Sequence, residues 1–176
     1  VIQGFDPIDG QMIWKVYSLG EGVSPSFAVG DGLMFTSSGF EKTTLRTVRL
    51  GGSGDVTATH IAWENRKGVP TESSLLYVSP YLYAVTSGGI VTCYQGKSGE
   101  IVWQERIGGK HSSSPVYVDN KICFLADDGS TTILRPGARF DVLAKNKLDG
   151  RFQASMAVSN GRLFLRSDQE LFCVGE

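Results

Sequence analysis

The sequence carries little net charge and no long apolar run. Its 17 Lys and Arg residues nearly balance its 18 Asp and Glu residues, for a formal net charge of −1, so the charge pattern does not indicate a nucleic-acid partner. No run of 18 apolar residues predicts a membrane-spanning helix, and the first residues lack the basic start and apolar core of a signal peptide. Because the chain opens at Val1 in the middle of a repeat, we expect further sequence upstream, in which a targeting segment can lie.

Residues that commonly carry catalysis or bind metals are also scarce. The cysteines, Cys93, Cys123 and Cys173, are an odd number without close spacing, so they indicate neither a disulfide framework nor a metal site. We expect them to be small buried residues of strands. The histidines are His60 and His111, and no nucleophile-elbow motif accompanies the many serines. The sequence therefore predicts no catalytic residue.

Glycine, by contrast, is abundant, with 22 residues. Most glycines stand between short apolar runs, where a turn needs positive φ, and this alternation is typical of an all-β protein. The tryptophans add a period, because Trp14, Trp63 and Trp103 are separated by 63 − 14 = 49 and 103 − 63 = 40 residues. A period of about 40 residues predicts an array in which one supersecondary unit is repeated.

Two of the tryptophans end the same motif. Asp6, Asp9 and Gly10 precede Trp14, and Gly99 precedes Trp103, so that a glycine stands four residues before each of these tryptophans. We expect the repeat-equivalent tryptophans to be structural, because a large flat side chain can fill the space between neighbouring repeats.

The motif resembles the Ala-x-Asp-x-x-x-Gly-x-x-x-Trp blade signature of PQQ-like β-propellers, with Gly4 in the alanine position. The second copy has Cys93 for the alanine and Gln95 for the aspartate. A further copy has lost the signature, with Arg135, Arg139 and Ala144 in the aspartate, glycine and tryptophan positions. The resemblance covers nearly the whole chain and is closer to the bacterial PQQ-like repeat proteins than to the quinoprotein dehydrogenases. It implies an all-β fold, a partial β-propeller of four-stranded antiparallel blades, with about four blades of a larger ring.

The apolar runs and turns predict how the chain divides. The expected segments are the end of a blade at 1–21, whole blades at 22–68, 69–110 and 111–150, and an incomplete last blade at 151–176. The first strands are expected to carry equivalent valines, namely Val29, Val78, Val118 and Val158. Residues 49–59 are expected to form a flexible loop, and no helix longer than two turns is expected. The strand missing from the last blade is expected from upstream sequence, as in other closed propellers.

One group of residues is a candidate binding site. The connections between successive blades would gather around one mouth of the central channel, and propeller partners often use such a rim. The candidate rim residues are Glu21, Glu72, Lys110, His111, Arg151 and Gln153. The alternative is that a rim is polar only because water reaches it.

The resemblance suggests a non-catalytic scaffold that binds a protein or other macromolecular partner. Because the family includes outer-membrane-assembly propellers, a periplasmic or secreted location is expected. Two alternatives stay open: a quinoprotein-type dehydrogenase whose cofactor site lies in absent blades, and a carbohydrate-binding propeller using aromatics such as Tyr81 or Phe152. The quinoprotein site of the family uses calcium, a disulfide of adjacent cysteines and an aspartate base. No residue here matches that set, so we expect this segment to bind neither pyrroloquinoline quinone nor calcium.

Overall fold

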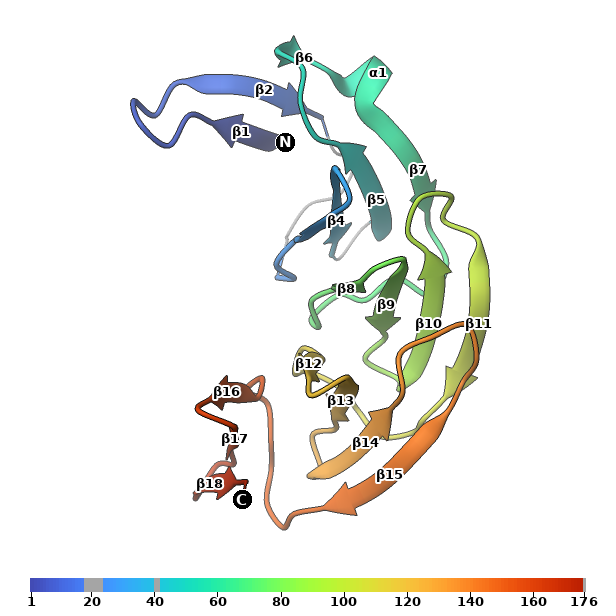
Figure 1. Ribbon diagram of the computed structural model, residues 1–176, viewed down its shortest axis with the longest axis vertical. Helices are drawn as coiled ribbons and strands as arrows, with labels where there is room; N and C mark the ends of the chain where they lie inside the picture. Colours follow the sequence, from blue (N-terminus) through green and yellow to red (C-terminus); the bar gives the residue numbers. More distant parts are fainter. Residues whose placement is uncertain (18–23, 40–41, 176) are drawn as a thin grey trace.

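The computed structural model describes residues 1–17, 24–39 and 42–175, which form a curved row of five β-sheets. We call these sheets blades 1 to 5. Figure 1 shows them as an arc, with β1 and β2 at one end, β16–β18 at the other, and the first strand of each later blade on the concave side. The all-β fold predicted from the sequence is confirmed, and blades 2, 3 and 4 are four-stranded antiparallel sheets.

The strands follow one another as meanders. Blade 1 contains β1 (Ile2–Phe5) and β2 (Met12–Val16). Blade 2 contains β3 (Ala28–Gly30), β4 (Leu33–Ser38), β5 (Thr44–Arg49) and β7 (Ile61–Asn65). Blade 3 contains β8 (Leu76–Val78), β9 (Tyr81–Val85), β10 (Ile90–Gln95) and β11 (Ile101–Arg106). Blade 4 contains β12 (Val116–Val118), β13 (Lys121–Leu125), β14 (Ser130–Leu134) and β15 (Val142–Lys147), and blade 5 contains β16 (Ala157–Ser159), β17 (Arg162–Arg166) and β18 (Leu171–Val174).

The first strands occur where predicted, but the expected valine equivalence is wrong by one residue. The residues just before the two-residue turns are Gly30, Val78, Val118 and Ser159, which pair with the first residues of the second strands. Val29 and Val158 are therefore equivalent to Tyr77 and Tyr117. Gly30 ends β3, and glycine fits there because a side chain would meet the Tyr77 ring of blade 3. A one-residue shift moves a side chain to the opposite face of a strand.

The tryptophan positions are structurally equivalent. Each directly follows the bulge residue of its own outer strand and pairs with a residue of the neighbouring strand. The pairs are Gly4 with Trp14, Thr47 with Trp63, Cys93 with Trp103, and Ile133 with Ala144. In the first copy, Asp6 and Asp9 accept backbone hydrogen bonds within the turn, and Gly10 has φ of 72°. The repeat read from the sequence is thus present in backbone register, including the copy without tryptophan.

The insertion in blade 2 differs from the flexible loop that its composition predicted. It contains β6 (Gly54–Asp55), which pairs in parallel with β2 of blade 1, and a single-turn helix, α1 (Thr57–His60). Val56, between them, is only 5% exposed and packs with Val16 and Val48. Burial of this valine and the pairing with β2 hold the insertion in place despite its glycines.

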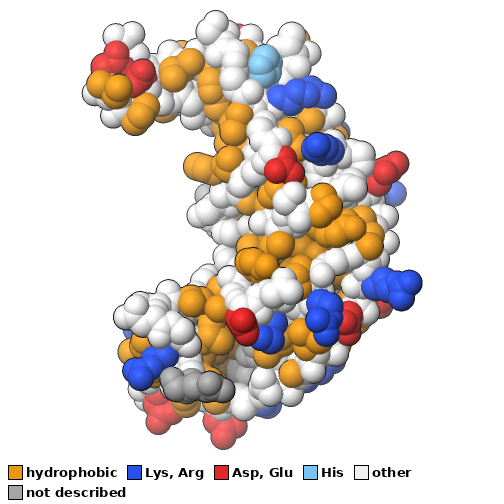
Figure 2. All heavy atoms as spheres, in the orientation of Figure 1, with side chains coloured by type: hydrophobic (Ala, Val, Ile, Leu, Met, Phe, Trp, Pro, Cys, Tyr) orange, Lys and Arg blue, Asp and Glu red, His pale blue; other side chains and the backbone are white. Residues whose placement is uncertain are grey.

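The hydrophobic core lies between blades. One cluster joins blades 2 and 3, a second joins blades 3 and 4, and a third joins blades 4 and 5. Cys93 and Cys123 are buried in these clusters as predicted, whereas the expectation for Cys173 is wrong: it is exposed, because nothing in the described structure covers the outer face of blade 5. In Figure 2, hydrophobic side chains continue through the middle of the arc, while charged side chains lie mostly along its convex edge and at its ends.

Candidate binding rim

The connections between blades are tied together by a chain of serines. The backbone N–H of Ser26 donates to Ser74 Oγ at 3.0 Å, that of Ser74 donates to Ser114 Oγ at 3.0 Å, and that of Ser114 donates to Ser155 Oγ at 2.9 Å. Each serine stands two residues before a first strand. These hydrogen bonds, each joining one blade to the next, make the connections a continuous rim.

Backbone hydrogen bonds fix the last two connections, from blade 3 to blade 4 and from blade 4 to blade 5, to the blades on both sides. His111 N–H donates to Ser87 O of blade 3, and Phe152 N–H donates to Asp127 O of blade 4. In return, Asp127 N–H donates to Lys110 O at 2.7 Å, and Asp168 N–H donates to Arg151 O at 2.9 Å. The rim is therefore held in place before any partner binds, which lowers the entropy cost of binding.

His111 is part of this framework and does not present its ring at the surface. The residue is 2% exposed, with Nδ1 3.0 Å from Leu125 O and Nε2 2.9 Å from Gly108 O. Its repeat equivalent in the next connection is Phe152, which is fully buried. The sequence could not distinguish a buried histidine in a turn from an exposed one.

The other candidate rim residues are exposed, apart from Glu21, which lies outside the described residues. Glu72, Lys110, Arg151 and Gln153 all reach solvent. The Lys110 ammonium lies 3.6 Å from Asp127, whose carboxylate also accepts hydrogen bonds from the Ser112 N–H and hydroxyl. Lys110 is thus partly neutralised by its neighbour.

A hollow opens at the blade 5 end of this rim. It has a volume of about 430 Å³ and is lined by Arg151, Gln153, Arg166, Ser167 and Asp168 among others. Within the described residues, neither arginine forms an ion pair. The two guanidinium groups and one amide can donate to carboxylate or carbonyl oxygens of a ligand.

Sequence reasoning missed Arg166. It ends β17 at the position that Val85 and Leu125 occupy in blades 3 and 4, where both are buried. An arginine at a repeat position otherwise occupied by apolar residues was the available signal.

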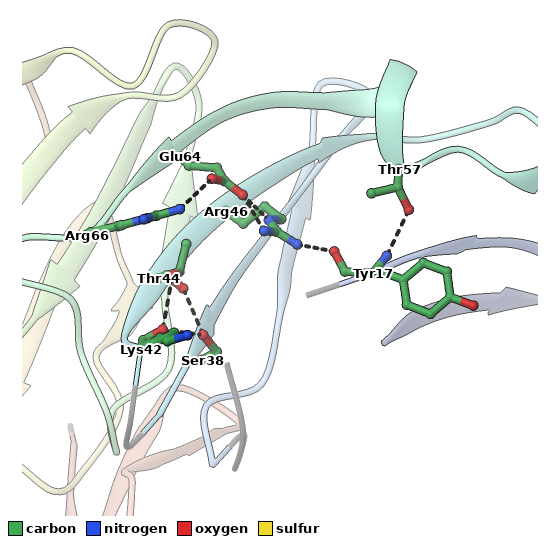
Figure 3. Close-up of polar contacts among 8 residues, drawn as sticks. All are labelled: Tyr17, Ser38, Lys42, Thr44, Arg46, Thr57, Glu64 and Arg66. Carbon is green, nitrogen blue, oxygen red and sulfur yellow. Dashed lines mark hydrogen bonds and ion pairs between the residues drawn. The ribbon is translucent and has the colours of Figure 1, made fainter. Parts of the chain in front are cut away.

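A second polar cluster lies between blades 1 and 2 (Figure 3). The side chain of Arg46 is 4% exposed, forms an ion pair with Glu64 and donates to the backbone oxygen of Tyr17. Thr57 of the insertion accepts from the Tyr17 N–H at 3.0 Å. This cluster joins β2, β5, β7 and α1, and because its groups bind one another it is structural.

The described residues offer no cluster of the side chains that commonly bind a metal ion. Among them, no three His, Cys, Asp or Glu side chains gather, and the cysteines stand in three different blades. That this chain binds neither quinone nor calcium stays a prediction. In the part of the chain described, no helix is long and apolar enough to span a membrane.

The carbohydrate alternative loses one of its two aromatics. Phe152 is fully buried against Phe172, so it cannot stack on a sugar. Tyr81 is half-buried at the start of β9.

The comparisons with known proteins agree with the blade geometry. The family described as outer membrane protein assembly factor BamB matches residues 52–136. BamB from Moraxella catarrhalis superposes with a TM-score of 0.70 at 17% identity, over 96% of this chain and 50% of that chain. The chain is a PQQ-like β-propeller repeat protein.

Other propellers share the fold at lower sequence identity. The computationally designed Ika4 protein has a TM-score of 0.73 at 9% identity, with 94% of this chain and 98% of that one covered. A europium-containing methanol dehydrogenase has a TM-score of 0.55 at 12% identity, with 73% of this chain and 26% of that one covered. No curated protein sequence matches. This PQQ-like repeat chain spans half the length of the BamB structure that it resembles.

Proposed function

We propose that this propeller is a non-catalytic scaffold that binds a protein partner through its rim. The observation that carries the proposal is the preformed hollow at the blade 5 end, where Arg151, Gln153 and Arg166 surround about 430 Å³. Guanidinium groups without an ion-pair partner are suited to carboxylates on a partner surface. The net charge of −1 argues against a nucleic-acid partner.

The proposal places the protein outside the cytoplasm. Its support is the similarity to a family described as an outer membrane protein assembly factor. Under this proposal the partner is a protein of the same compartment with an acidic surface segment. The quinoprotein alternative has the fold similarity to methanol dehydrogenase in its favour, but the described residues contain no cluster of His, Cys, Asp or Glu side chains that could hold its metal ion.

Site-resolved photo-crosslinking tests the proposal. A photoreactive amino acid is placed at Gln153 or Glu72 on the rim, or at Glu105, which is exposed on β11. In the cell-envelope fraction, the rim positions should give a discrete protein adduct and Glu105 should not. Adducts of equal yield at all three positions, or none at the rim, would contradict a rim-binding scaffold.

A further inference from the structure

Tryptophan side chains fill the space between blades in a repeated way. The Trp63 indole donates to Gly96 O in the turn of the next blade at 2.8 Å and packs against Phe35 and Tyr94. The Trp103 indole donates to Gly137 O in the turn of blade 4 at 3.1 Å and packs against Tyr83. Each aromatic ring is carried on an extended outer strand and lies over the third-to-fourth-strand turn of the next blade.

The interface between blades 4 and 5 has smaller residues at the same positions. Ala144 stands at the tryptophan position, Cys123 is equivalent to Tyr83, and Leu165 is equivalent to Phe124. Within the described residues, blade 5 has no fourth strand and no turn leading to one. Three aromatic positions of the blade 3–blade 4 interface are therefore occupied by small or aliphatic side chains.

These smaller residues leave a hollow of about 170 Å³. Its walls are largely apolar and include Cys123, Ile133, Met156, Leu163, Leu165 and Val174. Ile133 is the backbone partner of Ala144, so the hollow adjoins the position without tryptophan. Asn146 and Lys147 also line it, and it shares no residue with the rim hollow.

We propose that this hollow binds an aromatic side chain, of indole size, from an extended segment of a protein partner. An apolar hollow between packed elements binds apolar groups well because it holds little ordered water. The form of the occupant is suggested by the neighbouring interfaces, where an aromatic ring on an extended strand packs between two blades. The proposal rests on the proposed function in taking the partner to be a protein.

Titration with N-acetyl-tryptophanamide, followed by amide chemical shifts and the thermal midpoint, tests the proposal. We expect saturable binding, a raised midpoint and shifts centred on Ile133, Leu163 and Val174. N-acetyl-leucinamide should bind at least about tenfold more weakly. Titration with free indole distinguishes a protein side chain from a small aromatic molecule as the occupant. If indole binds and N-acetyl-tryptophanamide does not, the occupant is a small molecule and the proposal is wrong.

Filling variants make the test specific. Leu165→Phe restores the residue of blade 4, and Ala144→Trp restores the missing tryptophan; each should weaken amide binding at least about tenfold. Leu143→Trp, at the residue just before Ala144 in β15, is the matched control. Leu143 does not line the hollow, so this change should leave binding unchanged. Circular dichroism shows whether each variant is folded. If Ala144→Trp does not fold, the binding measured for Leu165→Phe alone decides the test. Absence of saturable binding, or binding unaffected by Leu165→Phe, overturns the proposal. Loss of rim crosslinks would not affect this result, so the two proposals fail separately.

Discussion

The interfaces on the two sides of the array are built differently. Between blades 3 and 4, Tyr83, Val85 and Cys93 pack against Ile122 and Phe124 in a fully apolar cluster. Between blades 1 and 2, an apolar cluster around Val16, Met34 and Val48 is joined by the buried Arg46 and by the insertion. The same repeat can therefore stack either by apolar packing alone or with an added polar contact and an extra strand.

The difference can be traced to one repeat position. Arg46 is equivalent to Thr92 and Thr132, and its partner Glu64 is equivalent to Gln104 and Lys145. In blade 3 the pair is neutral, with Gln104 donating to Thr92 Oγ1 at 2.8 Å. The ion pair joins β5 and β7 of blade 2, and Arg46 contacts blade 1 by donating to Tyr17 O. Because a buried ion pair adds little net stability, blade 1 should be held less firmly than blade 4.

The largest expected effect is on the apolar interface. Trp103→Ala should lower the free energy of unfolding by roughly 3 to 5 kcal/mol, because the indole fills space between blades 3 and 4 and donates to Gly137 O. Urea denaturation measures it. Ile101→Ala, an exposed residue of the same strand, is the control, and an unchanged midpoint for Trp103→Ala would show that the indole does not support the interface.

A smaller effect is expected at the polar interface. Glu64→Ala should cost about 2 kcal/mol, since it leaves the buried Arg46 cation without its carboxylate while Glu64 itself is partly exposed. The double variant Arg46→Leu/Glu64→Leu should be closer to the parent, because it removes both charges. If the double variant loses more stability than the single one, the ion pair itself stabilises the fold.

Alkaline pH should weaken the blade 3–blade 4 interface. Burial raises the pKa of the Cys93 thiol from 9.0 to about 12, and burial raises the pKa of Tyr83 beside it. The folded state therefore keeps both groups neutral, and their contribution to stability is complete below pH 9.0 and is lost as the pH rises toward 12. Urea midpoints should fall between about pH 8 and about pH 10, less so in Cys93→Ala. Equal slopes for parent and variant would show that Cys93 does not contribute.

No effect is expected from the cofactors of the quinoprotein relatives. Pyrroloquinoline quinone and calcium, alone or together, should neither bind saturably nor shift the thermal midpoint, because the described residues form no cluster of metal ligands and the sequence has no pair of adjacent cysteines. Calorimetry and absorbance titration measure this. Saturable micromolar binding would favour the enzyme alternative.

The sequence predicted features that repeat and missed those that depend on a single contact. The period of the tryptophans and the apolar second strands were sufficient for the blades, because each position is supported by its copies. The docking of the insertion depends on Val56 and on pairing with β2, neither of which repeats. The register of β3 puts Gly30, not Val29, at the end of the strand, where it lies against the Tyr77 ring of the next blade, and the sequence pattern does not show this contact.

The candidate site was predictable in outline only. Repeat equivalence placed Lys110 and Arg151 on successive connections, where both are exposed. It could not tell that His111 is buried with both ring nitrogens near carbonyl oxygens, because these contacts, with Leu125 of the following blade and Gly108 of the connection, are not visible in the sequence pattern. Arg166 was missed since it comes from a strand end and approaches the rim only in three dimensions.

The affinity of the crosslinked partner for a charge-reversed rim tests the central claim most directly. Calorimetry would compare the parent with Arg151→Glu/Arg166→Glu, and with Lys97→Glu in the exposed turn at the opposite end of the strands of blade 3. The account predicts a dissociation constant at least about tenfold larger for the rim variant and unchanged for Lys97→Glu. Equal affinity of all three proteins for the partner would contradict a scaffold that binds through its rim.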